Sequence, residues 1–304
     1  MADASTPIIV AERLTRRYGR RTGVEELSLD VPDGTLFGFL GPNGSGKTTT
    51  IRVLLGLLQA NGGRARVFGL DCWRDSHRIK ADVGYLPGDL RLYPWLNCRE
   101  AVRIHTLVRG RDLSREALEL AEDFSLDPDV RVRSMSRGMR QKLGLILALA
   151  HQPRLCILDE PTTSLDPLMQ QKLYARLRER VSAGNTVFFS SHTLSEVERL
   201  CDRVAILREG RLVAHETLEA LRARARRVVT IHWRSSAPLA EIAPPPPNLD
   251  LVERKNRRWV AMLTGPVMDL VRWCADKPID DLAIEHPDLG RLFREYYEEV
   301  SEDT

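Results

Sequence analysis

The first two-thirds of the chain alternates short apolar runs with longer amphipathic stretches. Three runs are apolar at most positions and are bounded by polar or turn residues: Leu36–Leu40, Leu155–Leu158 and Thr186–Ser190. Short continuous apolar runs are typical of strands that are buried on both faces of a parallel sheet. A pattern of helical period follows the first run, over Lys47–Leu58. Strands that alternate with helices predict an α/β fold with a parallel sheet.

The pattern changes between Gly88 and Ala150, where stretches of helical period dominate and no such strand run occurs. We interpret this segment, about residues 88–150, as a helical subdomain inserted into the sheet domain. The most apolar segments, Val53–Leu58 and Leu143–Ala150, are far shorter than the ~20 residues that cross a bilayer. If the protein works at a membrane, the sequence predicts that another chain holds it there.

The last part of the chain has a different pattern. A basic helical stretch, Leu218–Arg227, contains the expected boundary between a domain of residues 1–217 and an accessory domain of residues 218–304. Pro244–Pro247 is expected to be extended and unable to pair in a central strand. The other segments predict a small α/β appendage, with strands and helices in chain order: Val228–Trp233, Trp259–Leu263, helical Pro266–Asp276, Leu282–Ile284 and a terminal helix.

Composition excludes few classes of protein. The chain of 304 residues is 43% hydrophobic, and its formal net charge of +3 gives no argument for binding nucleic acid. Its five scattered cysteines form no CxxC pair, which argues against a disulfide framework or zinc site and favours a reducing compartment. Cys156 is expected to be a small core residue. Met1–Pro7 shows no secretory signal.

A glycine-rich segment follows the first apolar run. It reads Gly41-Pro-Asn-Gly-Ser-Gly-Lys-Thr48 and fits GxxxxGK[ST] between a predicted strand and a predicted helix. The glycines let backbone N–H groups turn toward phosphates, and the helix N-terminus adds partial positive charge. Lys47 can reach the β- and γ-phosphates, and the Thr48 hydroxyl can ligate Mg²⁺. We expect nucleotide contacts from Gly41, Pro42, Asn43, Gly44, Ser45, Gly46, Lys47, Thr48 and Thr49.

Two carboxylates stand at the end of the apolar run Leu155–Leu158. They are Asp159 and Glu160, and the carboxyl ends of strands are where α/β sheets place their ligands. Asp159 suits a contact to Mg²⁺, whereas Glu160 suits a general base that acts on the attacking water. Two surface carboxylates would be the alternative if the phosphate loop were absent.

Three further motifs occur in chain order. Met135-Ser-Arg-Gly-Met-Arg-Gln-Lys142 precedes an apolar helix, Ser164-Leu-Asp-Pro167 follows Glu160, and His192 ends the next apolar strand. With the two motifs above, about residues 7–215 resemble the ATP-binding cassette of ABC transporters. The resemblance implies a P-loop NTPase (RecA-like) parallel sheet with an N-terminal antiparallel strand part and the inserted helical subdomain.

The resemblance also implies a head-to-tail homodimer, or a paired cassette, with two ATP molecules at the interface. The segment Met135–Lys142 corresponds to the family's signature motif. Its Ser136 and Gly138 would face the γ-phosphate held by the partner copy, as suits a hydroxyl at a helix N-terminus. Asp166 would cross the interface. An ordinary helix cap is the alternative role for Ser136.

Within one subunit, the resemblance assigns the hydrolysis of ATP to Glu160, His192 and Lys47. His192 would contact the γ-phosphate and help to position Glu160 and the water. Tyr18 matches the aromatic residue that stacks on adenine, and a strand tyrosine without that role is the alternative.

The sequence departs from the family pattern at two places. The signature is usually LSGGQ, whereas Met135–Met139 adds a charge at Arg137. Where the family has a glutamine that touches Mg²⁺ and links the site to the membrane partner, this chain has Gly88. Asp89 or a water molecule could replace that glutamine, or Asp89 could be an ordinary loop acid.

The C-terminal region and the ending Pro287–Tyr297 resemble export-type cassettes. These work at the cytoplasmic face of the membrane, bound to separate permeases, and move drugs, antibiotics, lipids or polysaccharides outward. An importer motor is one alternative. A soluble ABC ATPase acting on ribosomes or nucleic acid is another, but those carry two cassettes or a coiled-coil insertion. Glu160 and His192 together argue against a cassette that binds ATP without hydrolysing it.

Overall fold

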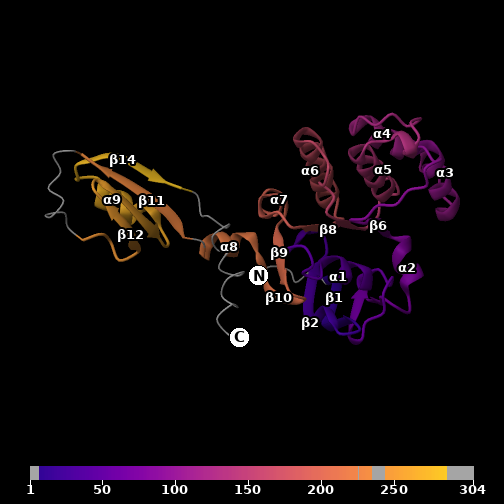
Figure 1. The fold of residues 1–304 in the computed structure, drawn as a ribbon, viewed down its shortest axis with the longest axis horizontal. Coiled ribbons are helices and arrows are strands. Elements are labelled where there is room, and N and C mark those ends of the chain that lie inside the picture. The colour runs from indigo at the N-terminus through magenta and orange to yellow at the C-terminus, as the bar shows by residue number, and fades with distance from the viewer. Residues whose placement is uncertain (1–6, 225, 235–243, 286–304) are drawn as a thin grey trace. The chain divides into compact units, whose positions relative to one another are not determined.

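The computed structural model describes residues 7–224, 226–234 and 244–285 (Figure 1). The chain divides into two compact units, Met1–Glu216 and Thr217–Thr304. None of the helices in these described ranges has the length and apolar character needed to cross a bilayer.

The centre of the first unit is a six-stranded sheet in the order β10-β9-β3-β8-β7-β6. Its strands are β3 (Leu36–Leu40), β6 (Val83–Leu86), β7 (Leu155–Asp159), β8 (Thr186–Ser191), β9 (Arg203–Arg208) and β10 (Arg211–Thr217). The strands β3, β7 and β8 are buried at every position and pair in parallel. The prediction of short strands buried on both faces is therefore confirmed, and Cys156 in β7 is fully buried as expected.

A second, antiparallel sheet precedes and follows β3 in the chain, with the order β2-β1-β4-β5. Its strands are β1 (Pro7–Tyr18), β2 (Arg21–Pro32), β4 (Gly62–Val67) and β5 (Leu70–Asp71). Helix α1 (Lys47–Leu54) contacts β2 and β4 of this sheet and β7 of the parallel sheet, so one apolar core joins the two sheets. The predicted end of this helix at Leu58 is wrong, because Gly56 adopts φ +60° and terminates the helix earlier.

The segment with helical pattern folds into three helices that contact one another: α3 (Cys98–Arg109), α4 (Ser114–Asp123) and α5 (Arg137–Leu149). Asn97 and Glu100 form a capping box at the start of α3, and Ser136 caps α5. Figure 1 shows these helices gathered beside β6, which α5 contacts. Three other helices of this unit are α2 (Ser76–Ala81), α6 (Pro167–Ser182) and α7 (Leu194–Leu200), of which α6 and α7 pack on β3 and β8.

The second unit contains an antiparallel sheet in the order β12-β13-β11-β14, so β12 and β14 are its outer described strands. Its elements are α8 (Leu218–Arg224), β11 (Arg227–Trp233), β12 (Leu249–Lys255), β13 (Arg258–Leu263), α9 (Val267–Cys274) and β14 (Ile279–Ile284). Trp233 and Trp259 meet edge to face with ring centroids 4.8 Å apart in its core. Trp273 of α9 donates its indole N–H to the carbonyl of Pro244.

The strands predicted at Val228–Trp233 and Trp259–Leu263 and the helix at Pro266–Asp276 are confirmed. The strand predicted at Leu282–Ile284 begins earlier, at Ile279. Strand β12 was not predicted, because a run of charged residues interrupts the alternation of its apolar and polar positions. The predicted terminal helix and the segment Pro287–Tyr297 lie outside the described residues.

Candidate nucleotide-binding and hydrolysis site

The glycine-rich segment forms the turn between β3 and α1. Its first amide, that of Gly41, donates to the carbonyl of Ser191 at the end of β8. Gly44 and Gly46 have φ of +82° and +107°, in the left-handed region that favours glycine. A Cβ atom on Gly46 would lie 2.4 Å from the carbonyl oxygen of Gly23, so a larger residue would displace this turn.

The start of α1 fits an anion. In the described part of the chain no side chain caps this helix, so its first N–H groups are available to a ligand, and its dipole favours negative charge there. The Lys47 side chain is only 5% exposed, and its ammonium donates to the carbonyls of Gly41 and Pro42. Among the described residues nothing bonds the buried hydroxyl of Ser45. These groups suit the phosphates of a nucleotide.

A cavity of about 370 Å³ opens beside the loop. Seven of its lining residues, Arg52 among them, come from the loop and α1, and the others include Tyr18, Arg21 and Glu160. A volume of this size is within the range of small-molecule sites. The two arginines were not singled out in the sequence, where nothing distinguished them from other basic residues.

Asp159, at the end of β7, is bonded on both carboxylate oxygens. It accepts from the Thr48 hydroxyl at 2.8 Å and from the Ser190 hydroxyl at 2.5 Å. Its side chain is almost completely buried, so these bonds offset the cost of removing the charge from water. The Thr48 and Asp159 oxygens are thereby adjacent, and both are of the kind that Mg²⁺ prefers. Ser190 was missed in the sequence, although it is a polar residue at the end of an apolar strand.

Glu160 follows Asp159 and is surrounded by two of the other predicted residues. One carboxylate oxygen lies 3.4 Å from the Lys47 ammonium, and the other lies 2.7 Å from Nδ1 of His192. The structure therefore brings together all three residues to which hydrolysis was assigned. The carboxyl ends of β3, β7 and β8 are neighbours in the sheet, which is why three distant segments meet here.

Tyr18 ends β1 and lines the same cavity as the phosphate loop. Its hydroxyl lies 3.5 Å from that of Thr49, and the Arg16 guanidinium lies over its ring. The ring is partly exposed, so it is accessible to a base, and stacking on adenine stays a prediction.

The signature residues and Asp166 do not line this cavity. Ser136 is exposed, and its hydroxyl accepts from the amide of Met139 as a helix cap. Asp166 is an exposed cap of α6 and accepts from the amide of Met169. One chain thus places these residues away from its own phosphate loop.

The position of the family's glutamine, Gly88, lies directly beside the carboxylate of Asp159. A Cβ atom on Gly88 would lie 3.2 Å from Oδ2 of Asp159. Asp89 instead points to Arg91, with which it forms an ion pair at 2.9 Å on an exposed loop. The structure therefore pairs Asp89 with Arg91, whereas a residue that replaced the glutamine would need to reach Mg²⁺.

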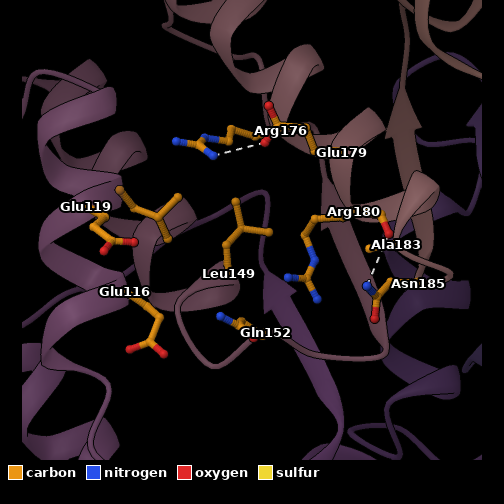
Figure 2. A pocket seen from close by; sticks show the side chains of 10 residues that line it. Glu116, Glu119, Leu149, Gln152, Arg176, Glu179, Arg180, Ala183 and Asn185 are labelled. Carbon is orange, nitrogen blue, oxygen red and sulfur yellow. Dashed lines mark hydrogen bonds and ion pairs between the residues drawn. The ribbon is translucent and has the colours of Figure 1, made fainter.

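A second cavity, of about 260 Å³, lies between α4 and α6 and contains none of the predicted residues (Figure 2). It is strongly charged, but its charged side chains are already bonded to neighbouring groups. Arg176 forms ion pairs with Asp123 and Glu179, and Arg180 donates to the carbonyl of Pro153. We find no set of groups in it that is aimed at a ligand.

The fold and the geometry beside the phosphate loop are those of a P-loop ATPase. The family model described as ABC transporter matches residues 24–163. The bacitracin transport ATP-binding protein BcrA of Bacillus licheniformis is 37% identical over 72% of this chain and 73% of that protein. The daunorubicin resistance ATP-binding protein DrrA3 of Streptomyces coeruleorubidus is 33% identical over 96% of each chain.

The structure of an ATP binding subunit of an ABC transporter is also similar. It is 29% identical, has a TM-score of 0.67, and the match covers 71% of this chain and 92% of that one. The chain therefore belongs to the ATP-binding proteins of the ABC transporter family. It is an ATPase of that family, and the resemblance seen in its motifs is confirmed.

Proposed function

We propose that this chain is the motor subunit of an exporter and works with a permease that is a separate membrane chain. The observation that carries the proposal is the meeting of Lys47, Glu160 and His192 beside the phosphate loop. Such a site can hold phosphates and activate water, so it hydrolyses ATP rather than only binding it. The names of two relatives, which refer to bacitracin transport and daunorubicin resistance, support export as the work that hydrolysis drives.

Each residue of the site has a task in this proposal. The loop amides and Lys47 bind the phosphates. Thr48 and Asp159 would hold Mg²⁺, which neutralises phosphate charge when it is bound. Glu160 accepts a proton from water, and the bond from His192 keeps its carboxylate in one orientation.

A second copy completes the site. Ser136 lies exposed at the N-terminus of α5, away from the cavity of its own chain, and it can meet the γ-phosphate bound by another copy. Gly138 follows in the first turn of that helix. We therefore propose a head-to-tail dimer in which each nucleotide contacts both copies, with Asp166 at the interface.

A groove between the sheet and the helices α3 and α5 is the proposed docking surface for the permease. Its volume is about 340 Å³, and its apolar wall includes Leu57, Leu90, Leu92 and Leu147. Tyr93 and Trp95 are largely exposed on the loop that enters this groove, and exposed aromatic side chains are typical of interfaces. Docking there would hold the chain at the cytoplasmic face of the membrane. We assign the second unit, from about residue 218 onward, as an accessory domain.

The replacement Glu160→Gln tests the catalytic assignment. The amide has nearly the same shape but cannot accept the proton, so we expect hydrolysis to fall roughly 10²–10⁴-fold while ATP still binds. ATP with Mg²⁺ should then trap a dimer that light scattering detects. Hydrolysis at the wild-type rate, or a protein that stays monomeric with bound ATP, would contradict the proposal.

A further inference from the structure

The backbone of Glu160 is held in an unusual conformation. Its φ is +51°, a region that residues other than glycine rarely adopt unless their surroundings hold them there. Its amide donates to the Ser190 hydroxyl at 3.1 Å. Its carbonyl accepts from the side-chain amide of Gln141 at 3.3 Å, and the same amide group donates to the carbonyl of Pro161 at 3.0 Å. Gln141 thus holds one side of the turn that aims the Glu160 carboxylate.

Gln141 belongs to the helix that carries the signature. It follows Ser136, the cap of α5, by five residues, which is about 7.5 Å along a helix. The first turn of α5 also touches the far end of the same loop, since a Cβ atom on Gly138 would lie 2.7 Å from the carbonyl oxygen of Ser164. Ser164 too has a positive φ, of +66°. A movement of α5 would therefore act on the loop at both of its ends.

We propose that Gln141 is a positioning residue that couples Glu160 to the signature end of α5. The inference rests on the proposed head-to-tail dimer, in which Ser136 contacts the nucleotide of the partner copy while Glu160 acts on the nucleotide of its own chain. Engagement of Ser136 fixes α5, and the two bonds from Gln141 then fix the carbonyls of Glu160 and Pro161. Hydrolysis at one site consequently depends on the occupancy of the other, which is a coupling between two distinct sites.

The chain offers a matched control for this residue. Gln170 on α6 donates its side-chain amide to the carbonyl of Leu165, at 3.2 Å, in the same loop. It supports the loop as Gln141 does, but it does not belong to the signature helix and does not bond the carbonyl of Glu160. Gln170→Leu therefore removes a comparable bond without removing the proposed link.

The test measures ATP hydrolysis by the full chain as a function of ATP concentration. For Gln141→Leu we expect kcat to fall about 5–50-fold, within the usual range of coupling between sites. KM should change less than about two-fold, and the Hill coefficient should fall from above 1 in the wild type to about 1. Gln170→Leu should keep all three values within about two-fold. Gln141→Glu, which replaces the donor with an oxygen that repels the carbonyls, should match Gln141→Leu and decides the matter if Gln141→Leu does not fold.

Three results would overturn the inference: a wild-type Hill coefficient of 1, unchanged kcat and Hill coefficient in folded Gln141 variants, or an equal loss in Gln170→Leu. These differ from a failure of the proposed function, which Glu160→Gln reports independently. In addition, Gln141→Leu should not lower the residual rate of Glu160→Gln, because a positioning residue has no effect once the group it positions is lost.

Discussion

The two units of the chain bury different kinds of side chain. The first unit buries Lys47, Asp159 and Ser190 where its parallel strands end. The core cluster of the second unit, within its described residues, is made of apolar and aromatic side chains around Trp233 and Trp259. Burying a polar group is costly unless it is bonded. Lys47 and Asp159, the buried lysine and the buried aspartate of the first unit, both lie at the edge that holds the phosphate loop, and this edge therefore differs from the apolar core of the second unit.

The replacement with the largest expected effect tests this comparison in the aromatic core of the second unit. Trp259→Ala should lower the free energy of unfolding of the second unit by about 3–5 kcal/mol, the usual effect for a buried large aromatic residue. Denaturant unfolding followed by circular dichroism measures it, and ATP hydrolysis should stay within about two-fold of wild type. Val252→Ala, at an exposed position in β12, is the control and should have little effect. Loss of hydrolysis in proportion to the unfolding of this unit would break the comparison.

The corresponding replacement in the first unit removes the buried ammonium group of Lys47. Lys47→Ala should weaken ATP binding about 10–100-fold, because the phosphates lose a charge-assisted bond. Calorimetric titration with ATP and Mg²⁺ measures this, while the unfolding of the second unit should not change. Lys255→Ala, which removes an exposed lysine of the second unit, serves as control. An unchanged affinity for ATP in the Lys47 variant would show that the loop does not bind phosphates as we describe.

A smaller effect concerns a buried histidine of the first unit. Burial lowers the pKa of His151 to about 4, with Arg109 as the next cause and His105 and Arg180 contributing in the same direction. The unfolded state therefore binds a proton at higher pH than the folded state does. Stability from neutral His151 is present above the unfolded pKa of about 6.5 and is lost as the pH falls toward 4.

His151→Gln removes this titration. The free energy of unfolding, measured from pH 8 to pH 5, should decline less in the variant than in the wild type, and the difference should begin near pH 6.5. Parallel pH profiles for the two proteins would show that His151 is protonated equally in both states.

The smallest expected effect is that of Asp89→Asn. Asp89 is exposed and paired with Arg91, so its loss should leave the Mg²⁺ dependence of hydrolysis within about two-fold of wild type. Gly88→Gln is the informative counterpart, because its side chain begins next to Asp159 and should change that dependence. A higher Mg²⁺ requirement in Asp89→Asn would mean that the carboxylate leaves Arg91 and takes over the task of the missing glutamine.

Much of the first unit could be predicted because its signals are local. The strands β3, β7 and β8 are short and apolar throughout, and the phosphate loop is a contiguous motif, so the meeting of Lys47 and Glu160 followed from the rule for parallel sheets. The antiparallel sheet was expected only from the family resemblance, since β1 pairs with repeated register shifts that blur any alternation. The bonds from Ser190 and Gln141 were missed because they depend on tertiary contacts between segments that are distant in the sequence.

In the second unit, the strands that could be predicted from the sequence are those with buried side chains. The strands β11 and β13 carry buried aromatic and aliphatic residues and were found, whereas β12, a charged strand, was not. The hydrogen bond from Trp273 to Pro244 could not be predicted. A proline run predicts an extended backbone, but it does not indicate which side chain donates to its carbonyls.

The position of β12 and β14 as the outermost described strands of their sheet has a consequence for how the protein behaves in concentrated solution. An open strand edge can pair with another molecule and start aggregation. Here β14 carries Asp280 and Asp281, and β12 carries Glu253, Arg254 and Lys255. Two β14 edges that approached each other would bring like charges together, which is unfavourable for strand pairing. The charged run that hid β12 from prediction is also of the kind that disfavours pairing of an edge strand with another molecule.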